Sequence, residues 1–340
     1  MAGAIPLIRA GAMAPFLRWM RENGSPVDAL LQDTDLASFA VDDPHQPIPL
    51  LSLFRFACLA SRIEGPDLPA RVVTPSSLSE MGIIGKLAYS GDTIRDALTS
   101  VMTALHYHTT HEMILVQPAR DGAVVREAWG LRLDDETRHF AQQYVAALIQ
   151  SLCDPSGTGR PAFARMALVA HPIHGIAHLR RYFGEHVDVA RDKTLELQIP
   201  SSVIDRPCLP VVSDLPGDRL PPVTPLPHGK DSLIPSARVV VDGLLAHGSP
   251  TIEQLAVAAG QSVRTFQRRL AEEGTTFSRL VEDVRRERAM AGLAGGQSPA
   301  GEIAALLGYK RQSSFTRAVR RWSGTTPRTI RAKNGRHAEP

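Results

Sequence analysis

Residues 251–273, with the sequence TIEQLAVAAGQSVRTFQRRLAEE, predict two short helices joined by a tight turn. Thr251 is a good helix N-cap, although Glu253 lies one position short of the ideal capping-box spacing. Gly260 permits a left-handed turn, and Ser262 can cap the second helix. A short helix, a tight turn that contains glycine and a second short helix form a helix-turn-helix unit.

The second of these predicted helices has an apolar and a polar face. Val263, Phe266 and Leu270 are spaced to point inward. The outward set consists of Arg264, Thr265, Gln267 and Arg268. Arg and Gln on a helix that fits the major groove can make bidentate contacts with guanine or adenine edges. The alternative is an ordinary solvated surface, and repetition of the pattern further along the chain argues against it.

A second unit of this kind follows at residues 298–322, with the sequence SPAGEIAALLGYKRQSSFTRAVRRW. Ser298 and Pro299 are predicted to open its first helix as N-cap and first-turn proline, and Gly308 to make the turn. The outward side chains near the start of its second helix are Arg311, Gln312, Ser313, Ser314 and Arg317. Two units in one chain indicate sequence-specific DNA binding far more strongly than one.

Residues 277–294 predict a longer helix between the two units. At about 1.5 Å per residue, this helix spans on the order of 25 Å. With the helix ends added, that length can set two recognition helices in successive major-groove segments about 34 Å apart. The run Arg285-Arg286-Glu287-Arg288 in this helix favours phosphate contact, and its alternative is an ordinary solvated helix face. Arg320 and Arg321, later in the chain, also favour phosphate contact over base reading.

Charge is distributed unevenly along the 340 residues, although the net charge is only +3. Residues 249–340 hold 16 Lys and Arg against 8 Asp and Glu, a net of +8. The other 248 residues hold 22 against 27, a net of −5. A basic C-terminal part on a mildly acidic protein is typical of a segment that faces a polyanion.

These segments resemble the signature of the AraC/XylS-type transcription regulators, through residues 274–290 (GTTFSRLVEDVRRERAM) and 302–331 (EIAALLGYKRQSSFTRAVRRWSGTTPRTIR). The resemblance covers about residues 232–331 and implies a sequence-specific DNA-binding transcription factor. By resemblance, the base-reading positions fall on Arg264, Gln267 and Arg268 in the first unit and on Arg311, Gln312, Ser313 and Arg317 in the second. The chain departs from the family pattern at Ala300-Gly301, a weak helix start, and at Val319, where an aromatic residue is usual.

Seven prolines between Arg206 and Pro227 mark the best domain boundary: Pro207, Pro210, Pro216, Pro221, Pro222, Pro225 and Pro227. Proline removes an amide donor and fixes φ, so this stretch suits neither a helix nor a central strand. We therefore predict a regulatory, effector-sensing domain at residues 1–205, a proline-rich linker at 206–230 and a DNA-binding domain at 231–340.

The predicted fold is an α+β N-terminal regulatory domain followed by an all-α domain with two helix-turn-helix units joined by a linker helix. Apolar periodicity predicts helices at residues 50–63, 93–105, 135–153 and 232–246, the last beginning near Pro235. Residues 113–129 predict a hairpin with Asp121-Gly122 as its turn, and strands are predicted at 165–170 and 194–199.

The N-terminal part also resembles the arabinose-binding-type regulatory domain of some AraC-type regulators, over about residues 46–209. The similar segments are IPLLSLFRFACLA (48–60), GIIGKLAYSGDTIRDAL (82–98) and RRYFGEHVDVARDKTLELQIPSSVID (180–205). The resemblance implies a small-molecule effector, whose identity the domain's name does not give, or a role in homodimer formation. An activator of this kind would also contact RNA polymerase.

Two histidine clusters raise the question of a metal site: His106, His108 and His111, then His171, His174 and His178. The first has no carboxylate or cysteine at ligand spacing, and the second precedes Tyr182-Phe183-Gly184, which the family resemblance implies is structural, so we predict no metal. A separate hypothesis places His106 and Tyr107 in an effector pocket.

Other function classes lack their sequence signals. GxSxG, HExxH, GxGxxG and P-loop motifs are absent, so we predict no enzyme and no cofactor. Cys58, Cys153 and Cys208 lie far apart, as reduced thiols of a cytoplasmic protein do. Neither a signal peptide nor an apolar run of about 18 residues occurs, so no membrane association is predicted. The alternatives that remain are a non-specific architectural DNA-binding protein and an N-terminal domain that processes a small molecule.

Overall fold

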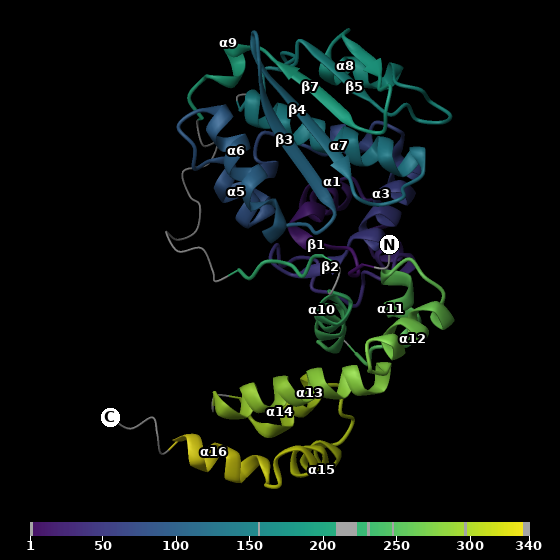
Figure 1. Ribbon diagram of the computed structural model, residues 1–340, viewed down its shortest axis with the longest axis vertical. Coiled ribbons are helices and arrows are strands. Elements are labelled where there is room, and N and C mark those ends of the chain that lie inside the picture. Colours follow the sequence, from purple (N-terminus) through teal and green to yellow (C-terminus); the bar gives the residue numbers. More distant parts are fainter. Residues whose placement is uncertain are drawn as a thin grey trace. The chain divides into compact units, whose positions relative to one another are not determined.

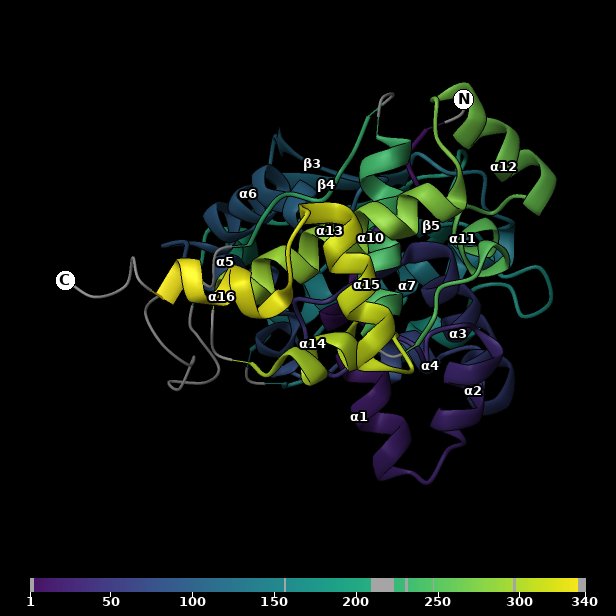
Figure 2. The same cartoon turned by 90° about the horizontal axis from the view of Figure 1, so that it is seen from below.

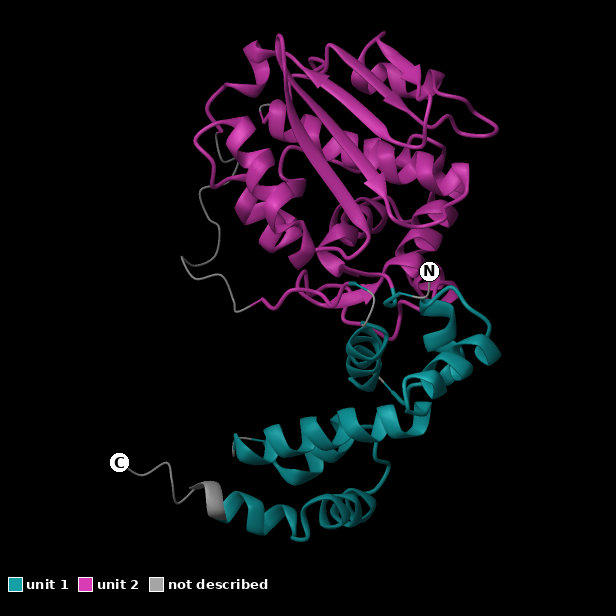
Figure 3. Ribbon diagram, in the orientation of Figure 1, with its two compact units in different colours: residues 1–5, 229–340 teal, residues 6–228 magenta. Residues whose placement is uncertain are grey.

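The computed structural model describes residues 3–155, 157–208, 223–229, 232–246, 248–295 and 298–335 (Figure 1). The chain forms two compact units, coloured separately in Figure 3. One contains Pro6–His228, and the other contains Gly229–Pro340 together with Met1–Ile5. Of the predicted linker at 206–230, residues 209–222 and 230 lie outside the described residues.

The larger unit, Pro6–His228, contains a sheet with the strand order β3-β4-β7-β5-β6 among its described residues. The bounds are β3 Glu112–Ala119, β4 Gly122–Trp129, β7 Leu195–Ile199, β5 Arg165–Leu168 and β6 Val187–Val189. All neighbouring strands are antiparallel except β5 and β6. A separate short pair joins β1 (Leu7–Arg9) to β2 (Pro47–Pro49).

The predicted β3–β4 hairpin is confirmed, but the predicted turn is wrong by one residue. Ala119 pairs with Gly122, so Arg120 and Asp121 form the turn and Gly122 is the first residue of β4. Gly122 has φ +104°, and a Cβ there would lie 2.0 Å from the carbonyl oxygen of Ile199. Glycine is therefore needed for the approach of β7, which a local turn pattern does not reveal.

Helices pack against this sheet, and α7 (Asp135–Cys153) passes behind it in Figure 1. The predicted helices at 50–63, 93–105 and 135–153 are confirmed as α3 (Leu50–Glu64), α6 (Ile94–Ala104) and α7. The strands predicted at 165–170 and 194–199 are present as the slightly shorter β5 and β7. The remaining helices of the unit are α1 Ala14–Glu22, α2 Val27–Asp33, α4 Leu68–Arg71, α5 Ile83–Ala88, α8 Arg180–Phe183 and α9 Ser201–Ile204. Its 3-10 helices are η1 Ala10–Met13, η2 Ser77–Met81, η3 Leu105–Tyr107 and η4 Ala177–Leu179.

The smaller unit is helical throughout its described elements, which confirms the predicted combination of an α+β and an all-α part. Its helices are α10 Leu233–Leu245, α11 Ile252–Ala258, α12 Val263–Glu272, α13 Phe277–Ala294, α14 Ala300–Leu306, α15 Gln312–Ser323 and α16 Pro327–Gly335. Helix α10 begins at Leu233 and not near Pro235, because proline is tolerated in the first helical turn. Figures 1 and 2 show α12 near the start of α13, and α15 packed alongside α13.

The described part of Met1–Ile5 packs within the smaller unit. Ile5 is fully buried, and its backbone N–H donates to Ser236 Oγ at 2.8 Å. The guanidinium of Arg269, on α12, donates to the carbonyl oxygen of Gly3 at 2.8 Å. The N-terminal residues therefore supply hydrogen-bond partners to α10 and α12, far away in sequence.

Candidate DNA-binding surface and ligand cavity

Local hydrogen bonds fix the first helix-turn-helix unit. Thr251 and Gln254 form a reciprocal capping box, so the partner of Thr251 is Gln254 and not Glu253. Gly260 has φ +62° and makes the left-handed turn. Ser262 then caps α12, because its hydroxyl accepts from the backbone N–H of Thr265 at 3.2 Å. These contacts satisfy amides that a helix start leaves open.

Helix α12 places most of the predicted DNA-binding side chains on the surface. Phe266 and Leu270 are buried beneath the helix, whereas Arg264, Gln267 and Arg268 are exposed. Thr265 is half-buried, and its hydroxyl accepts a hydrogen bond from Ser262 at 2.9 Å, so this side chain belongs partly to the cap. The exposed face can therefore present two guanidinium groups and one amide to base edges.

Helix α15 repeats the arrangement. Phe315 and Val319 are fully buried in a cluster with Ala289, Leu293, Ile303, Ala304 and Leu307. Val319 thus fills the core although the family pattern has an aromatic residue there. Exposed on the same helix and its N-cap are Arg311, Gln312, Ser313 and Arg317. Ser314 is half-buried and accepts from Arg317 Nη2 at 3.4 Å.

The predicted start of the second unit needs a correction. Pro299 is the N-cap of α14, and Ser298 precedes it, so Ser298 is not the N-cap. Neither Pro299 nor Arg311, the N-cap of α15, makes a side-chain capping bond.

Three arginines of α13, in the run that the sequence favours for phosphate contact, have partners within the chain. Arg285 Nε donates to the carbonyl oxygen of Leu307 at 3.0 Å, and its guanidinium lies 5.4 Å from the ring centre of Tyr309. Arg286 pairs with Asp283 at 3.1 Å, and Arg288 pairs with Asp242. Arg285 therefore positions the turn between α14 and α15.

A glutamate of α13 also joins α15. Glu282 Oε1 accepts from Trp322 Nε1 at 2.9 Å and from Arg321 Nη2 at 2.6 Å. These two donors hold the pKa of the Glu282 carboxyl below its usual range. Arg321, which the sequence suggested for phosphate contact, thus has an internal partner.

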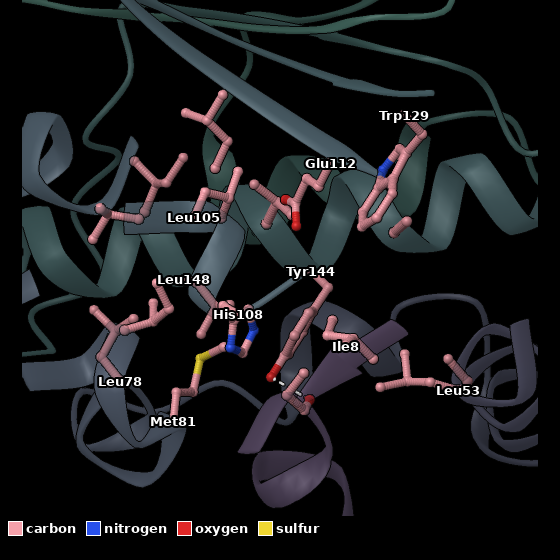
Figure 4. Close-up of a pocket in the computed structure, with 18 of the residues that line it drawn as sticks. Ile8, Leu53, Leu78, Met81, Leu105, His108, Glu112, Trp129, Tyr144 and Leu148 are labelled. Atoms are coloured by element: carbon pink, nitrogen blue, oxygen red, sulfur yellow. Dashed lines mark hydrogen bonds between the residues drawn. The ribbon is translucent and has the colours of Figure 1, made fainter. Parts of the chain in front are cut away.

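The larger unit encloses a cavity of about 110 Å³. Its walls come from β3, β4, α3, α5, α6 and α7, and they are almost wholly apolar. Figure 4 shows the side chains of Glu112, Trp129, Tyr144 and His108 around it. Among the described residues that line it, none is lysine or arginine.

Strand register brings two glutamates to the cavity side of the sheet. Glu112 pairs with Trp129, and Ile114 pairs with Glu127, so these four side chains share one face. Burial raises the pKa of Glu112 to about 8. Burial also raises the pKa of Glu127 well above its usual value; nearby Glu112 adds to this rise, and Arg138 opposes it. Neither Glu127 oxygen has a hydrogen-bond partner within the described part of the chain.

His108 lines the cavity, whereas His106 and Tyr107 do not. The hypothesis that His106 and Tyr107 form the pocket is therefore not supported for this cavity. Burial lowers the pKa of His108 to about 3, so its imidazole is neutral. Tyr144 donates its hydroxyl to the carbonyl oxygen of Ala12 at 2.9 Å, which fixes the ring at the cavity wall.

One histidine of the second cluster, His178, contacts the buried His139. His139 Nδ1 lies 2.7 Å from the carbonyl oxygen of Val169, and His139 Nε2 lies 3.1 Å from His178 Nε2. Over the residues that the structure describes, no group of three His, Cys, Asp or Glu side chains is arranged to hold a metal ion. Over those same residues, no helix has both the length and the apolar character needed to cross a membrane.

Two protein-family models match the chain. The arabinose-binding domain of AraC transcription regulators, N-terminal, matches residues 24–208, and a helix-turn-helix domain matches residues 255–333. The chain belongs to the AraC-type transcription regulators. This regulator is 26% identical to the HTH-type transcriptional regulator VirS of Mycobacterium tuberculosis. It is 27% identical to the ornithine utilization regulator of Pseudomonas aeruginosa. Each alignment covers 97% of both chains.

Sequence patterns did not identify Glu112 as a cavity residue, or Glu127 as its buried neighbour on the same face of the hairpin. The hairpin sequence did contain a signal for buried acids, because two glutamates occupy inward positions of strands that are otherwise apolar on that face. Arg269 was also missed, since its partner Gly3 lies more than 260 residues away.

Proposed function

We propose that the regulator recognises a specific DNA sequence by placing α12 and α15 in two successive major-groove segments. The observation that carries the proposal is the repeated side-chain geometry of the two helices. Phe266 and Phe315 are both fully buried, and each is followed two positions later by an exposed arginine, Arg268 or Arg317. The proposed base-reading set is Arg264, Thr265, Gln267 and Arg268 on α12, and Arg311, Gln312, Ser313, Ser314 and Arg317 at α15.

Charge supports the same proposal. The +8 balance of residues 249–340 supplies guanidinium and ammonium groups that can neutralise phosphates and release counterions. Phosphate contacts orient a protein on the duplex, and base contacts give it specificity. DNA affinity is therefore expected to fall steeply with salt, while site preference remains.

Selection of bound fragments from random and genomic DNA at physiological salt tests this function. The expected result is a motif with two half-elements about one helical turn apart. A specific regulator should bind that motif about 10³-fold or more tighter than unrelated duplex. Equal affinity for every duplex, in the full chain and in the chain incubated with candidate effectors, would support an architectural protein instead.

We further propose that a small molecule in the cavity of Pro6–His228 modulates DNA binding. The cavity supports this role because it is apolar and marked by one carboxyl group, as specific ligand sites commonly are. We expect the regulator to act as a homodimer. As an activator, it would also contact RNA polymerase. Coupling requires that the effector bind the DNA-bound and free states with different affinities.

A further inference from the structure

Glu112 is a half-buried acid with no hydrogen-bond or ion-pair partner among the described residues. Its carboxyl group faces the cavity and has no hydrogen bond or ion pair with any described residue. The neighbouring walls are the side chains of Phe54, Ile114 and Trp129, and their one polar group is the indole N–H of Trp129, which has no partner among the described residues. Enclosing a carboxyl in this way carries a free-energy cost that a well-placed partner can offset.

The charges around Glu112 do not balance. Glu127 lies on the same face of the hairpin, and Arg138 of α7 is the cation that acts on it. The guanidinium of Arg138 is held by the carbonyl oxygens of Lys193 and Leu131, at 3.3 and 3.4 Å. Arg138 therefore acts on Glu127, and among the described residues that line the cavity no lysine or arginine stands beside Glu112 to balance its charge.

We infer that the cavity binds a small amine with an apolar body, and that the ammonium group of this ligand pairs with the carboxylate of Glu112. The inference rests on the effector part of the proposed function and names the chemical class of the effector. The ammonium supplies the missing charge and donates hydrogen bonds to the carboxylate. The apolar body contacts the aromatic and aliphatic walls.

Size and charge both restrict the ligand. An apolar cavity of about 150 Å³ holds benzene in another protein, so the cavity of about 110 Å³ suits a single small ring or a short chain. A carboxylate ligand would add a negative charge beside Glu112, and no lining lysine or arginine among the described residues would offset it. A zwitterionic amino acid meets the same obstacle, because its own carboxylate would be desolvated against apolar walls.

Three probes of similar shape test the inference on the full-length regulator by isothermal titration calorimetry: benzylamine, benzyl alcohol and benzoate. Benzylamine at pH 8 is expected to bind about tenfold or more tighter than benzyl alcohol, because a buried hydrogen bond to a charged group is stronger than a neutral one. Benzoate is expected to show no saturable binding. Equal binding of the amine and the alcohol, or tighter binding of benzoate, would overturn the inference.

Glu112→Gln removes the charge and keeps the shape. This variant is expected to bind benzyl alcohol as the parent does and to lose the preference for benzylamine. Glu196→Gln is the matched control, because Glu196 lies on β7, pairs with Arg126 at 2.8 Å and does not line the cavity. The control should keep the preference, and a preference that survives in Glu112→Gln contradicts the role of Glu112.

A pH series on the unaltered regulator tests the same pairing without a variant that could fail to fold. The charged and titratable groups around Glu112 are Glu127 from β4, Arg138 and Tyr144 from α7, Cys58 from α3 and His108 after η3. Because burial raises the pKa of Glu112 to about 8, a bound ammonium must displace a proton below that pH. Benzylamine affinity should rise by up to about tenfold per pH unit between pH 6 and 8, whereas benzyl alcohol affinity should not rise. A flat profile for the amine would count against the pairing.

DNA binding, measured on the same samples, separates this inference from the proposed function. Specific DNA binding without amine preference overturns the ligand class alone. Amine preference without any change in DNA affinity supports the ligand class and overturns the effector role of the cavity.

Discussion

The two helix-turn-helix units of the regulator present similar side chains but are stabilised differently. The first has a capping box between Thr251 and Gln254 and a serine cap at Ser262. The second has no side-chain cap at Pro299 or Arg311. It is held instead by contacts from α13, where Arg285 binds the carbonyl of Leu307 and Glu282 binds Arg321 and Trp322. Two helices with comparable exposed side chains can thus rest on local hydrogen bonds in one unit and on tertiary contacts in the other.

The largest expected effect comes from the buried phenylalanine that each unit contains. Phe266→Ala and Phe315→Ala each empty a fully buried ring site, so each should lower the free energy of unfolding of its unit by about 3–5 kcal/mol. Urea denaturation followed by circular dichroism measures the loss. A cost below about 1 kcal/mol for either variant would show that its ring is not a core element.

The recognition arginines should have the next largest effect, on DNA binding rather than on folding. Arg268→Ala and Arg317→Ala are each expected to cost about 1–3 kcal/mol on the selected site and to relax preference at one base position. Arg320→Ala, a change later on α15, should instead weaken binding to all sequences alike and reduce the salt slope by about one. Unchanged base preference in the first two variants would refute their proposed role.

Cap substitutions address the difference between the units directly. Thr251→Ala should destabilise the first unit by about 1 kcal/mol, because it breaks the capping box. Ser298→Ala should change stability by less than about 0.5 kcal/mol, because Ser298 is not the N-cap of α14. Thermal denaturation of both variants compares them, and equal losses would remove the distinction between a capped and an uncapped unit.

The smallest expected effect is a pH dependence confined to the second unit. Hydrogen bonds from Trp322 and Arg321 lower the pKa of Glu282, so its carboxylate contributes stability above the ordinary glutamate pKa near 4.3. That contribution is lost as the pH falls through the lower pKa of the folded state. Glu282→Gln should therefore reduce the difference in denaturation midpoint between pH 7 and pH 3. An unchanged difference would mean that the contact adds nothing to stability.

Much of the DNA-binding surface was predictable, because its signals are local. Gly260 and Ser262 mark the turn and cap, and the spacing of Phe266 and Leu270 separates a buried face from an exposed one. Glu253 lies one position short of the capping-box spacing, as the sequence indicated, and the capping partner that the sequence analysis did not name is Gln254, the third helical residue. The predicted boundaries at residues 205 and 230 stay a prediction.

The sequence by itself determined several of the helices, the β3–β4 hairpin and the arginine-bearing helices α12 and α15, because periodicity, caps and glycine turns act within a few residues. Only the tertiary structure decided that Arg285 holds the carbonyl of Leu307 and that Gly3 accepts from Arg269. It alone decided that Glu112 faces an apolar cavity beside Glu127. The physical reason is that strand register and helix packing join residues distant in sequence, and burial then changes the chemistry of the groups they enclose.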